Sequence, residues 1–213
     1  VITSFAVATA ICVPLTGWLT QRFGQVRLFI ASVLLFVIAS FLCGLAPSLS
    51  LLVLFRVLQG ACGGPLMPLS QTLLLRVFPK KYAAAATGLW AMTTLIAPIL
   101  GPILGGTLCD NVGWAFIFWI NVPVAAVCSW FAWRLLRSHE TPLARARVDL
   151  VGLGLLVVWV GALQVMLDLG KEHDWFASPM IAGLAVVAAI GFVAFLIWEL
   201  TDAHPIVDLS LLS

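Results

Sequence analysis

The chain has 213 residues, of which 62% are hydrophobic and 9% charged, and its formal net charge is +2. Soluble domains contain about 45–50% apolar and about 25% charged residues, so this composition excludes a soluble globular protein. Most basic residues lie in short gaps between apolar runs rather than in one patch, which gives no reason to expect nucleic acid as a partner. The composition indicates an integral membrane protein, with the lipid bilayer as its surroundings.

Apolar runs of the length needed to cross a bilayer, about 20 residues, follow one another along the whole chain. To within a few residues they are 1–20, 28–46, 51–77, 83–108, 114–136, 150–169 and 177–198. Strict alternation of apolar and polar residues, which a membrane barrel requires, is absent from these runs. The sequence therefore predicts an all-α, polytopic helical bundle. Because the chain begins with Val1 inside an apolar run, we expect it to be a piece of a longer protein.

The gaps between the runs differ in charge in a way that predicts orientation. The second gap has no charge, the fourth has only Asp110, and the sixth has Lys171 among acidic residues. Basic residues gather in the first, third and fifth gaps, at Arg22, Arg27, Arg76, Lys80, Lys81, Arg134, Arg137, Arg145 and Arg147. Because cytoplasmic loops carry the excess of Lys and Arg, the odd gaps are predicted to be cytoplasmic and the even gaps periplasmic.

The first gap contains two glycines around a basic turn. Gly17 and Gly24 flank Arg22, and glycine permits close approach and unusual backbone angles. The pattern predicts a tight turn between antiparallel helices. An ordinary helical hairpin with cytoplasmic positive charge is the alternative interpretation.

The third run carries an arginine inside an otherwise apolar stretch. On a continuous helix, Arg56, Gly60, Gly63 and Met67 would share one face. An intramembrane arginine is costly and requires a partner, a water-filled cavity or a functional role. Two interpretations remain open: the side chain reaches the headgroups, or it is a buried charge in a transport pathway.

The fourth run combines small residues and prolines. Ala97, Gly101 and Gly105 form a repeat of small residues that lets another helix approach closely. Pro98 and Pro102 remove two helical hydrogen bonds and favour a bend. A bent, grooved helix suits a moving interface, although static packing would use the same glycines.

Neither cysteines nor histidines form a pattern that indicates metal binding or nucleophilic catalysis. No pair of the five cysteines has metal-ligand spacing, and most lie in apolar runs, which favours a packing role. The histidines lie in polar gaps, at His139, His173 and His204.

Together these features resemble the major facilitator superfamily of transporters. Residues 17–24 resemble the signature of its first cytoplasmic loop, residues 52–60 that of its fourth helix, and residues 101–106 that of the fifth helix of its antiporters. Residues 113–123 resemble the sixth helix of the fourteen-helix drug:proton antiporters. Within that family, the stretches 1–29, 65–71 and 205–209 are most similar to the inner-membrane pumps of tripartite efflux systems.

The resemblance implies a partial major facilitator fold. Residues 1–137 would be helices two to six of the N-terminal transport bundle, 138–149 a cytoplasmic loop, 150–198 two linker transmembrane helices, and 199–213 the start of the connection to a C-terminal bundle. Helix one and the C-terminal bundle would belong to the longer protein. Gln21 stands where the loop signature has an acidic residue, which calls into question an acid-based latch between the bundles.

The resemblance also implies a proton-coupled multidrug efflux antiporter of the inner membrane, driven by the proton gradient without a cofactor. Its partners would be hydrophobic drug-like substrates, a periplasmic adaptor and an outer-membrane channel. Arg56 would act in proton coupling. The expected cavity residues are Gln59, Gly60, Gly63, Met67, Gln71, Trp90 and Asn121. The expected gating residues are Gly17, Arg22, Gly24, Pro98, Gly101, Pro102, Gly105 and Gly106.

Three other functions are weighed against this one. A membrane-embedded enzyme would need convergent acidic, histidine or serine side chains at one membrane depth, and the runs contain no such set. A non-transporting packing or assembly module would not need the repeated prolines and glycines of the fourth run. A facilitator-superfamily transporter for another solute remains open.

Overall fold

The computed structural model describes residues 1–143 and 149–201. All regular elements in these ranges are helices, and the segments that are long and apolar enough to cross a membrane are Ile2–Phe23, Gln25–Gly44, Leu49–Val77, Lys80–Asn111, Phe116–His139, Leu150–Leu169 and Pro179–Thr201. The prediction of an all-α, polytopic membrane protein is therefore confirmed. The predictions for Arg145, Arg147, His204 and residues 205–209 lie outside the described residues.

The transmembrane segments are divided into helices that follow the predicted runs closely. They are α1 (Ile2–Phe23), α2 (Gln25–Gly44), α3 (Leu49–Gly63), α4 (Leu66–Val77), α5 (Ala83–Asn111), α6 (Phe116–Trp119), α7 (Asn121–Leu136), α8 (Leu150–Leu169) and α9 (Pro179–Thr201). Short 3₁₀ turns lie between some of them, at Lys80–Tyr82, Arg137–His139, Lys171–His173 and Trp175–Ala177.

The predicted third run, 51–77, is confirmed as one membrane-length segment, Leu49–Val77, but it is not one continuous helix. The α-helix stops at Gly63 and a new one begins at Leu66. Pro65 has no N–H group and cannot donate to the carbonyl of residue 61, which interrupts the hydrogen-bond ladder. The predicted run 114–136 is likewise divided, into α6 and α7. By contrast, α5 continues through Pro98 and Pro102 without interruption.

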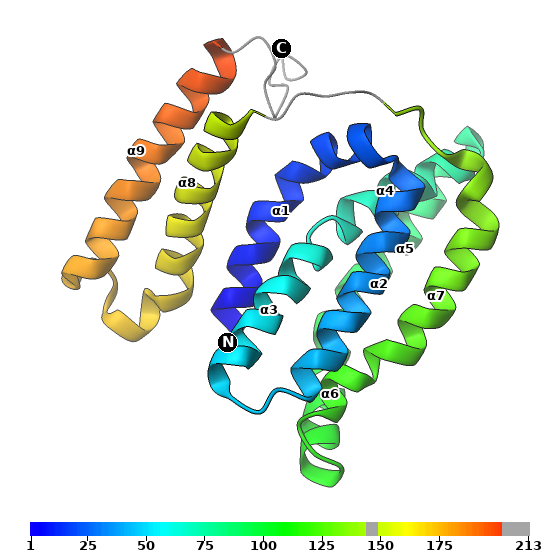
Figure 1. Ribbon diagram of the computed structural model, residues 1–213, viewed down its shortest axis with the longest axis horizontal. Helices are drawn as coiled ribbons and strands as arrows, with labels where there is room; N and C mark the ends of the chain where they lie inside the picture. The colour runs from blue at the N-terminus through cyan, green and yellow to red at the C-terminus, as the bar shows by residue number, and fades with distance from the viewer. Residues whose placement is uncertain (144–148, 202–213) are drawn as a thin grey trace.

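The helices form two groups that meet along α1 (Figure 1). In the first group α3 packs against both α1 and α2, and α2 packs against α7. In the second group α8 lies next to α1 and α9 lies beside α8, on the side away from α7 (Figure 1). The contact between the groups is close at Gly161, where an added Cβ would lie 4.0 Å from Val7.

A polar contact joins one end of the α8–α9 pair. The Asp149 carboxylate caps α8 by accepting hydrogen bonds from the Val151 and Gly152 amides, each at 3.0 Å. Its other oxygen accepts a hydrogen bond of 2.7 Å from the Trp198 indole near the end of α9. A buried indole N–H needs such a partner, so Asp149 both starts α8 and positions the end of α9 beside it.

Candidate functional site around Arg56

Arg56 lies on α3, two turns from the start of the helix. Ser48 caps this helix, with its hydroxyl accepting a hydrogen bond of 3.3 Å from the Leu51 amide. The half-buried Arg56 guanidinium lies over the Phe118 ring of α6, 4.5 Å from its centroid, and 5.7 Å from the Phe5 centroid on α1. Aromatic faces attract a cation, so the charge is held among α1, α3 and α6 rather than extended along the surface of its own helix.

A chain of hydrogen bonds fixes the orientation of the guanidinium. Arg56 donates to the Gln59 side-chain oxygen at 3.1 Å, and the Gln59 amide donates to the Ser40 hydroxyl at 2.6 Å. Ser40 in turn donates to the Phe36 carbonyl at 2.8 Å. Gln59 and Ser40 are buried, with 2% and 0% of their surfaces exposed. A guanidinium has only donors, and the Gln59 amide nitrogen is directed to Ser40, so the Gln59 oxygen is the atom that faces the arginine.

The arginine is incompletely satisfied by these contacts. Its Nε is buried and has no hydrogen-bond partner within residues 1–143 and 149–201. No carboxylate in these ranges forms an ion pair with it. A buried cation without an anion is unfavourable, so the site is chemically suited to receive a carboxylate or another anionic group.

The close contact of α1 and α3 depends on glycine. An added Cβ at Gly60 would collide with the Phe5 carbonyl oxygen, and one at Gly64 would lie 2.8 Å from the Cβ of Cys12. The Thr9 hydroxyl crosses the contact, 3.3 Å from the Gly60 carbonyl. Gly60 therefore places Arg56 by permitting the helix contact. Sequence reasoning did not select Gly64, although its spacing of four from Gly60 was the available signal.

The other residues expected in the cavity occupy different surroundings. Gly63 faces Phe36 of α2, with an added Cβ 3.4 Å from its ring, whereas Met67 of α4 is 54% exposed. Gln71 is half-buried on α4. The Trp90 indole of α5 donates to Ser70 at 3.0 Å, and Asn121 at the start of α7 donates to the Ile117 carbonyl at 3.5 Å. The structure thus brings only Gln59 into direct contact with Arg56. Gly60 and Gly63 lie further along the same helix.

Phe118 is not among the residues that the sequence assigns to the site. The structure places its ring, 6% exposed, directly against the guanidinium. The short helix α6 carries Phe118, and the Trp114 ring packs edge-on against it at 6.2 Å. No local signal connects residues 56 and 118, because the contact is created by tertiary packing.

The glycine and proline repeat of α5 lies on an uncovered surface. Pro98, Gly101 and Pro102 are exposed, and an added Cβ at Gly101, Gly105 or Gly106 would meet no described atom within 4 Å. No other described helix packs against this surface at Gly101, Gly105 or Gly106. It is therefore available to a further helix.

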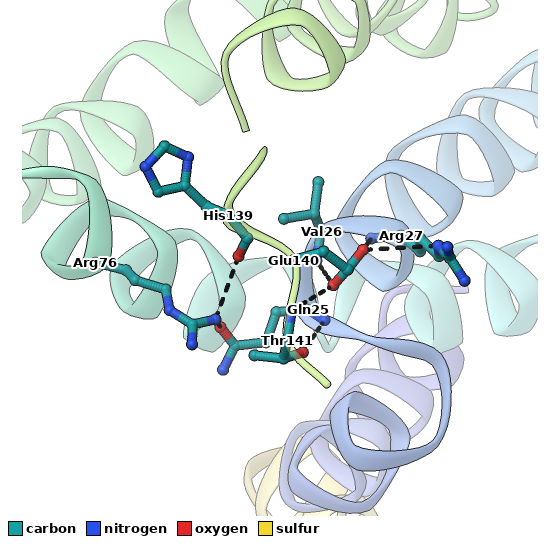
Figure 2. A network of polar contacts seen from close by, with 7 residues as sticks. All are labelled: Gln25, Val26, Arg27, Arg76, His139, Glu140 and Thr141. Carbon is teal, nitrogen blue, oxygen red and sulfur yellow. Dashed lines mark hydrogen bonds and ion pairs between the residues drawn. The ribbon is translucent and has the colours of Figure 1, made fainter. Parts of the chain in front are cut away.

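The predicted tight turn between α1 and α2 is organised by a distant acid (Figure 2). Gly24 alone separates the helices and has a φ of 85°, which favours glycine. The Glu140 carboxylate accepts hydrogen bonds from the Val26 and Arg27 amides at 3.1 and 3.0 Å, and Thr141 accepts one from Gln25 at 3.0 Å. An anion at a helix N-terminus satisfies free amides and complements the helix dipole. Gln21 stands where the loop signature has an acidic residue. Glu140 thus provides an acid beside the same turn.

The same cluster joins the first, third and fifth gaps of the chain. Arg76 donates to the Gln25 side chain at 3.1 Å and to the His139 carbonyl at 3.3 Å (Figure 2). The Arg27 Nε lies 3.8 Å from the Glu140 carboxylate. Gly17 lies on α1, seven residues before Gly24, and has no described atom within 4 Å of an added Cβ. The Arg22 guanidinium lies 5.5 Å from the Trp18 ring centroid.

Comparison with known proteins identifies the relationship. Residues 1–202 match the Major Facilitator Superfamily. Over 211 residues, 99% of the chain, it is 54% identical to the multidrug export protein EmrB of Haemophilus influenzae and 53% identical to EmrB of Escherichia coli K12. It is also 53% identical to the fatty acid resistance protein FarB of Neisseria gonorrhoeae. The chain spans 41–42% of the length of these relatives.

Proposed function

Because the chain belongs to the Major Facilitator Superfamily and is a multi-pass inner-membrane protein, we propose that it forms part of a proton-driven exporter of hydrophobic drug-like compounds. The observation that supports this most is the Arg56 site, where a cation is held inside the bundle by Gln59 and Phe118. A charge placed there at an energetic cost of a few kcal/mol is expected to have a functional role.

The proposed role of Arg56 is to control the proton affinity of a carboxylate. A fixed positive charge within a few ångströms favours the ionised form of an acid, so the acid would release its proton readily. That carboxylate would come from the part of the longer protein that the chain does not cover. Gln59 and Ser40 would keep the guanidinium aimed at it, since neither can rotate without breaking a buried hydrogen bond.

The proposed conformational element is the glycine face of α5. In transporters of this kind two bundles rock about a central site. The uncovered surface at Gly101 and Gly105 would meet the second bundle and close one side of the pathway. The energy source would be the proton gradient, with no cofactor. The partners would be a periplasmic adaptor of the EmrA type and an outer-membrane channel of the TolC type.

A second candidate substrate class is supported by one comparison. The identity to FarB, 53%, equals the identity to the Escherichia coli EmrB. A fatty acid is an apolar molecule with one carboxylate, which is the group that the Arg56 site is suited to receive. Fatty acids are therefore an alternative substrate of the same exporter fold.

The test is substrate-driven proton movement in everted vesicles containing the full-length protein, with Arg56→Ala, Arg56→Lys and wild-type proteins compared at equal membrane abundance. We expect the alanine variant to lose proton-coupled efflux, because the fixed charge is gone. Lys80→Ala, which removes a loop charge, is the control and should retain efflux. Full efflux by Arg56→Ala would refute the proposal. Efflux of fatty acids but not of other hydrophobic drug-like compounds would select the second substrate class.

A further inference from the structure

The cytoplasmic end of α7 carries a basic and aromatic surface that the transport site does not use. Trp130, Trp133, Arg134 and Arg137 follow one another at helical spacing and therefore share one face of the helix. They line a hollow of about 400 Å³. We call this hollow and its four lining residues the α7 basic hollow.

This face points away from the rest of the described bundle. The residues of α7 that are buried, Ser129 and Ala132, are not among the four that line the hollow, whereas Trp130 and Trp133 are 55% and 54% exposed. The helix packs against α2, and Figure 1 places α8 and α9 on the far side of the molecule. Large aromatic side chains on the outer face of a transmembrane helix are typical of the membrane–water interface.

The two arginines have no anionic partner within residues 1–143 and 149–201. The Arg134 guanidinium lies 5.6 Å from the Trp130 ring centroid, and neither Arg134 nor Arg137 forms an ion pair with a described residue. Glu140, the nearest carboxylate along the chain, is engaged by the α2 amides and Arg27. Favourable interaction with the end of the α7 dipole accounts for a basic residue here, but it does not account for a hollow with two of them.

The depth of the four residues fits a phospholipid headgroup. A helix rises 1.5 Å per residue, so Arg134 and Arg137 lie about 6 and 10 Å beyond Trp130 along the axis. If the indoles lie at the interface, the guanidiniums reach the level of the phosphates. Guanidinium binds phosphate through paired, charge-assisted hydrogen bonds, and the cytoplasmic leaflet is the one to which the basic gaps are assigned. A wholly apolar hollow on α9, lined by Ala189, Ile190, Val193, Ala194 and Ile197, has no such chemistry.

We propose that the α7 basic hollow binds the headgroup of an anionic phospholipid of the cytoplasmic leaflet, with Arg134 and Arg137 on the phosphate and the two indoles against the glycerol and upper acyl chains. Charge complementarity selects an anionic lipid over a zwitterionic one, because the described surroundings supply two positive charges and no negative charge. This site is separate from Arg56 and does not depend on the transported substrate.

The test is native mass spectrometry of the full-length protein titrated with phosphatidylglycerol or phosphatidylcholine in detergent. Each arginine near a phosphate contributes about a fivefold change in binding, so Arg134→Gln combined with Arg137→Gln should weaken phosphatidylglycerol binding about 30-fold. Phosphatidylcholine binding should change less than twofold. The matched control is Lys80→Gln combined with Lys81→Gln, which removes the same charge from a loop assigned to the same side and should leave phosphatidylglycerol binding within twofold.

Two outcomes of this titration would overturn the proposal. One is equal loss of binding in the two double variants, which would mean that the lipid responds only to total charge. The other is unchanged binding in the arginine double variant. A second measurement covers the possibility that protein occupies the hollow: Trp133→Cys in a cysteine-free background should react with a lipid-dissolved maleimide. Cross-linking of this cysteine to another part of the protein or to an adaptor, in place of that reaction, would also contradict the lipid assignment.

Discussion

Gly60 and Gly101 lie in similar small-residue patterns but have opposite surroundings, which allows a sharp comparison. A methyl group at Gly60 would collide with the backbone oxygen of Phe5 and lie 3.0 Å from Ala8, whereas at Gly101 it would meet nothing within 4 Å. Overpacking of a close contact costs about 1–3 kcal/mol. Alanine in a helix recovers up to about 1 kcal/mol relative to glycine.

For Gly60→Ala we expect an overpacking cost at the upper end of that range, about 3 kcal/mol, because a backbone atom cannot rotate away. Subtracting about 1 kcal/mol for the better helix propensity of alanine leaves a net loss of about 2 kcal/mol. For Gly101→Ala we expect a smaller effect than for Gly60→Ala, since the added methyl group meets no described atom within 4 Å and alanine favours the helix. Apparent melting temperature and membrane abundance of the full-length variants measure both. An unchanged melting temperature for Gly60→Ala would show that the α1–α3 contact is looser than described, and the reasoning would fail.

The remaining predictions concern sealing, orientation, the turn between α1 and α2, and α8. Gly101→Val and Gly105→Val should keep normal membrane abundance but lose drug resistance, because a larger side chain would separate α5 from the second bundle. Loss of membrane abundance in step with loss of activity would instead indicate static packing. A cysteine replacing Lys80 should be labelled only from the cytoplasm, and cysteines replacing Asn111 and Lys171 should be labelled only from the periplasm. Labelling of residue 80 from outside intact cells would contradict the predicted topology. Glu140→Ala should destabilise the start of α2 by about 1 kcal/mol, because the cap is lost. Amide exchange at Val26 and Arg27 should become faster, with little change at Leu51, and equal exchange rates in the variant and the wild type would contradict this. Asp168→Asn should leave proton coupling intact, because the Asp168 carboxylate already accepts a 3.0 Å hydrogen bond from Gln164 on the same helix. Uncoupled transport in this variant would show that α8 takes part in proton transfer.

The positions of the transmembrane segments could be predicted from sequence because they depend on the length and composition of local runs. The interruption at Pro65 was also accessible, since proline breaks the hydrogen-bond ladder, but the uninterrupted α5 shows that Pro98 and Pro102 do not have the same effect. Whether a proline divides a helix depends on the packing around it, which the sequence does not display.

The site was predicted only in part, for a similar reason. An arginine in an apolar run is visible locally, and so is a glutamine one turn later. Its aromatic cover by Phe118 joins residues far apart in the chain, and the cap on α2 comes from Glu140, beyond α7. Such contacts follow from tertiary packing and carry no signal in spacing or composition.

The central claim, that Arg56 sets the proton affinity of the transport site, is tested most directly by proton release on substrate binding. The purified full-length protein would be mixed with substrate in weakly buffered solution, and the pH change recorded for wild type and Arg56→Gln at matched substrate occupancy. The account predicts proton release by the wild type and a loss of that release in the variant, because the neighbouring acid would hold its proton without the fixed charge. Equal proton release by both proteins would contradict it.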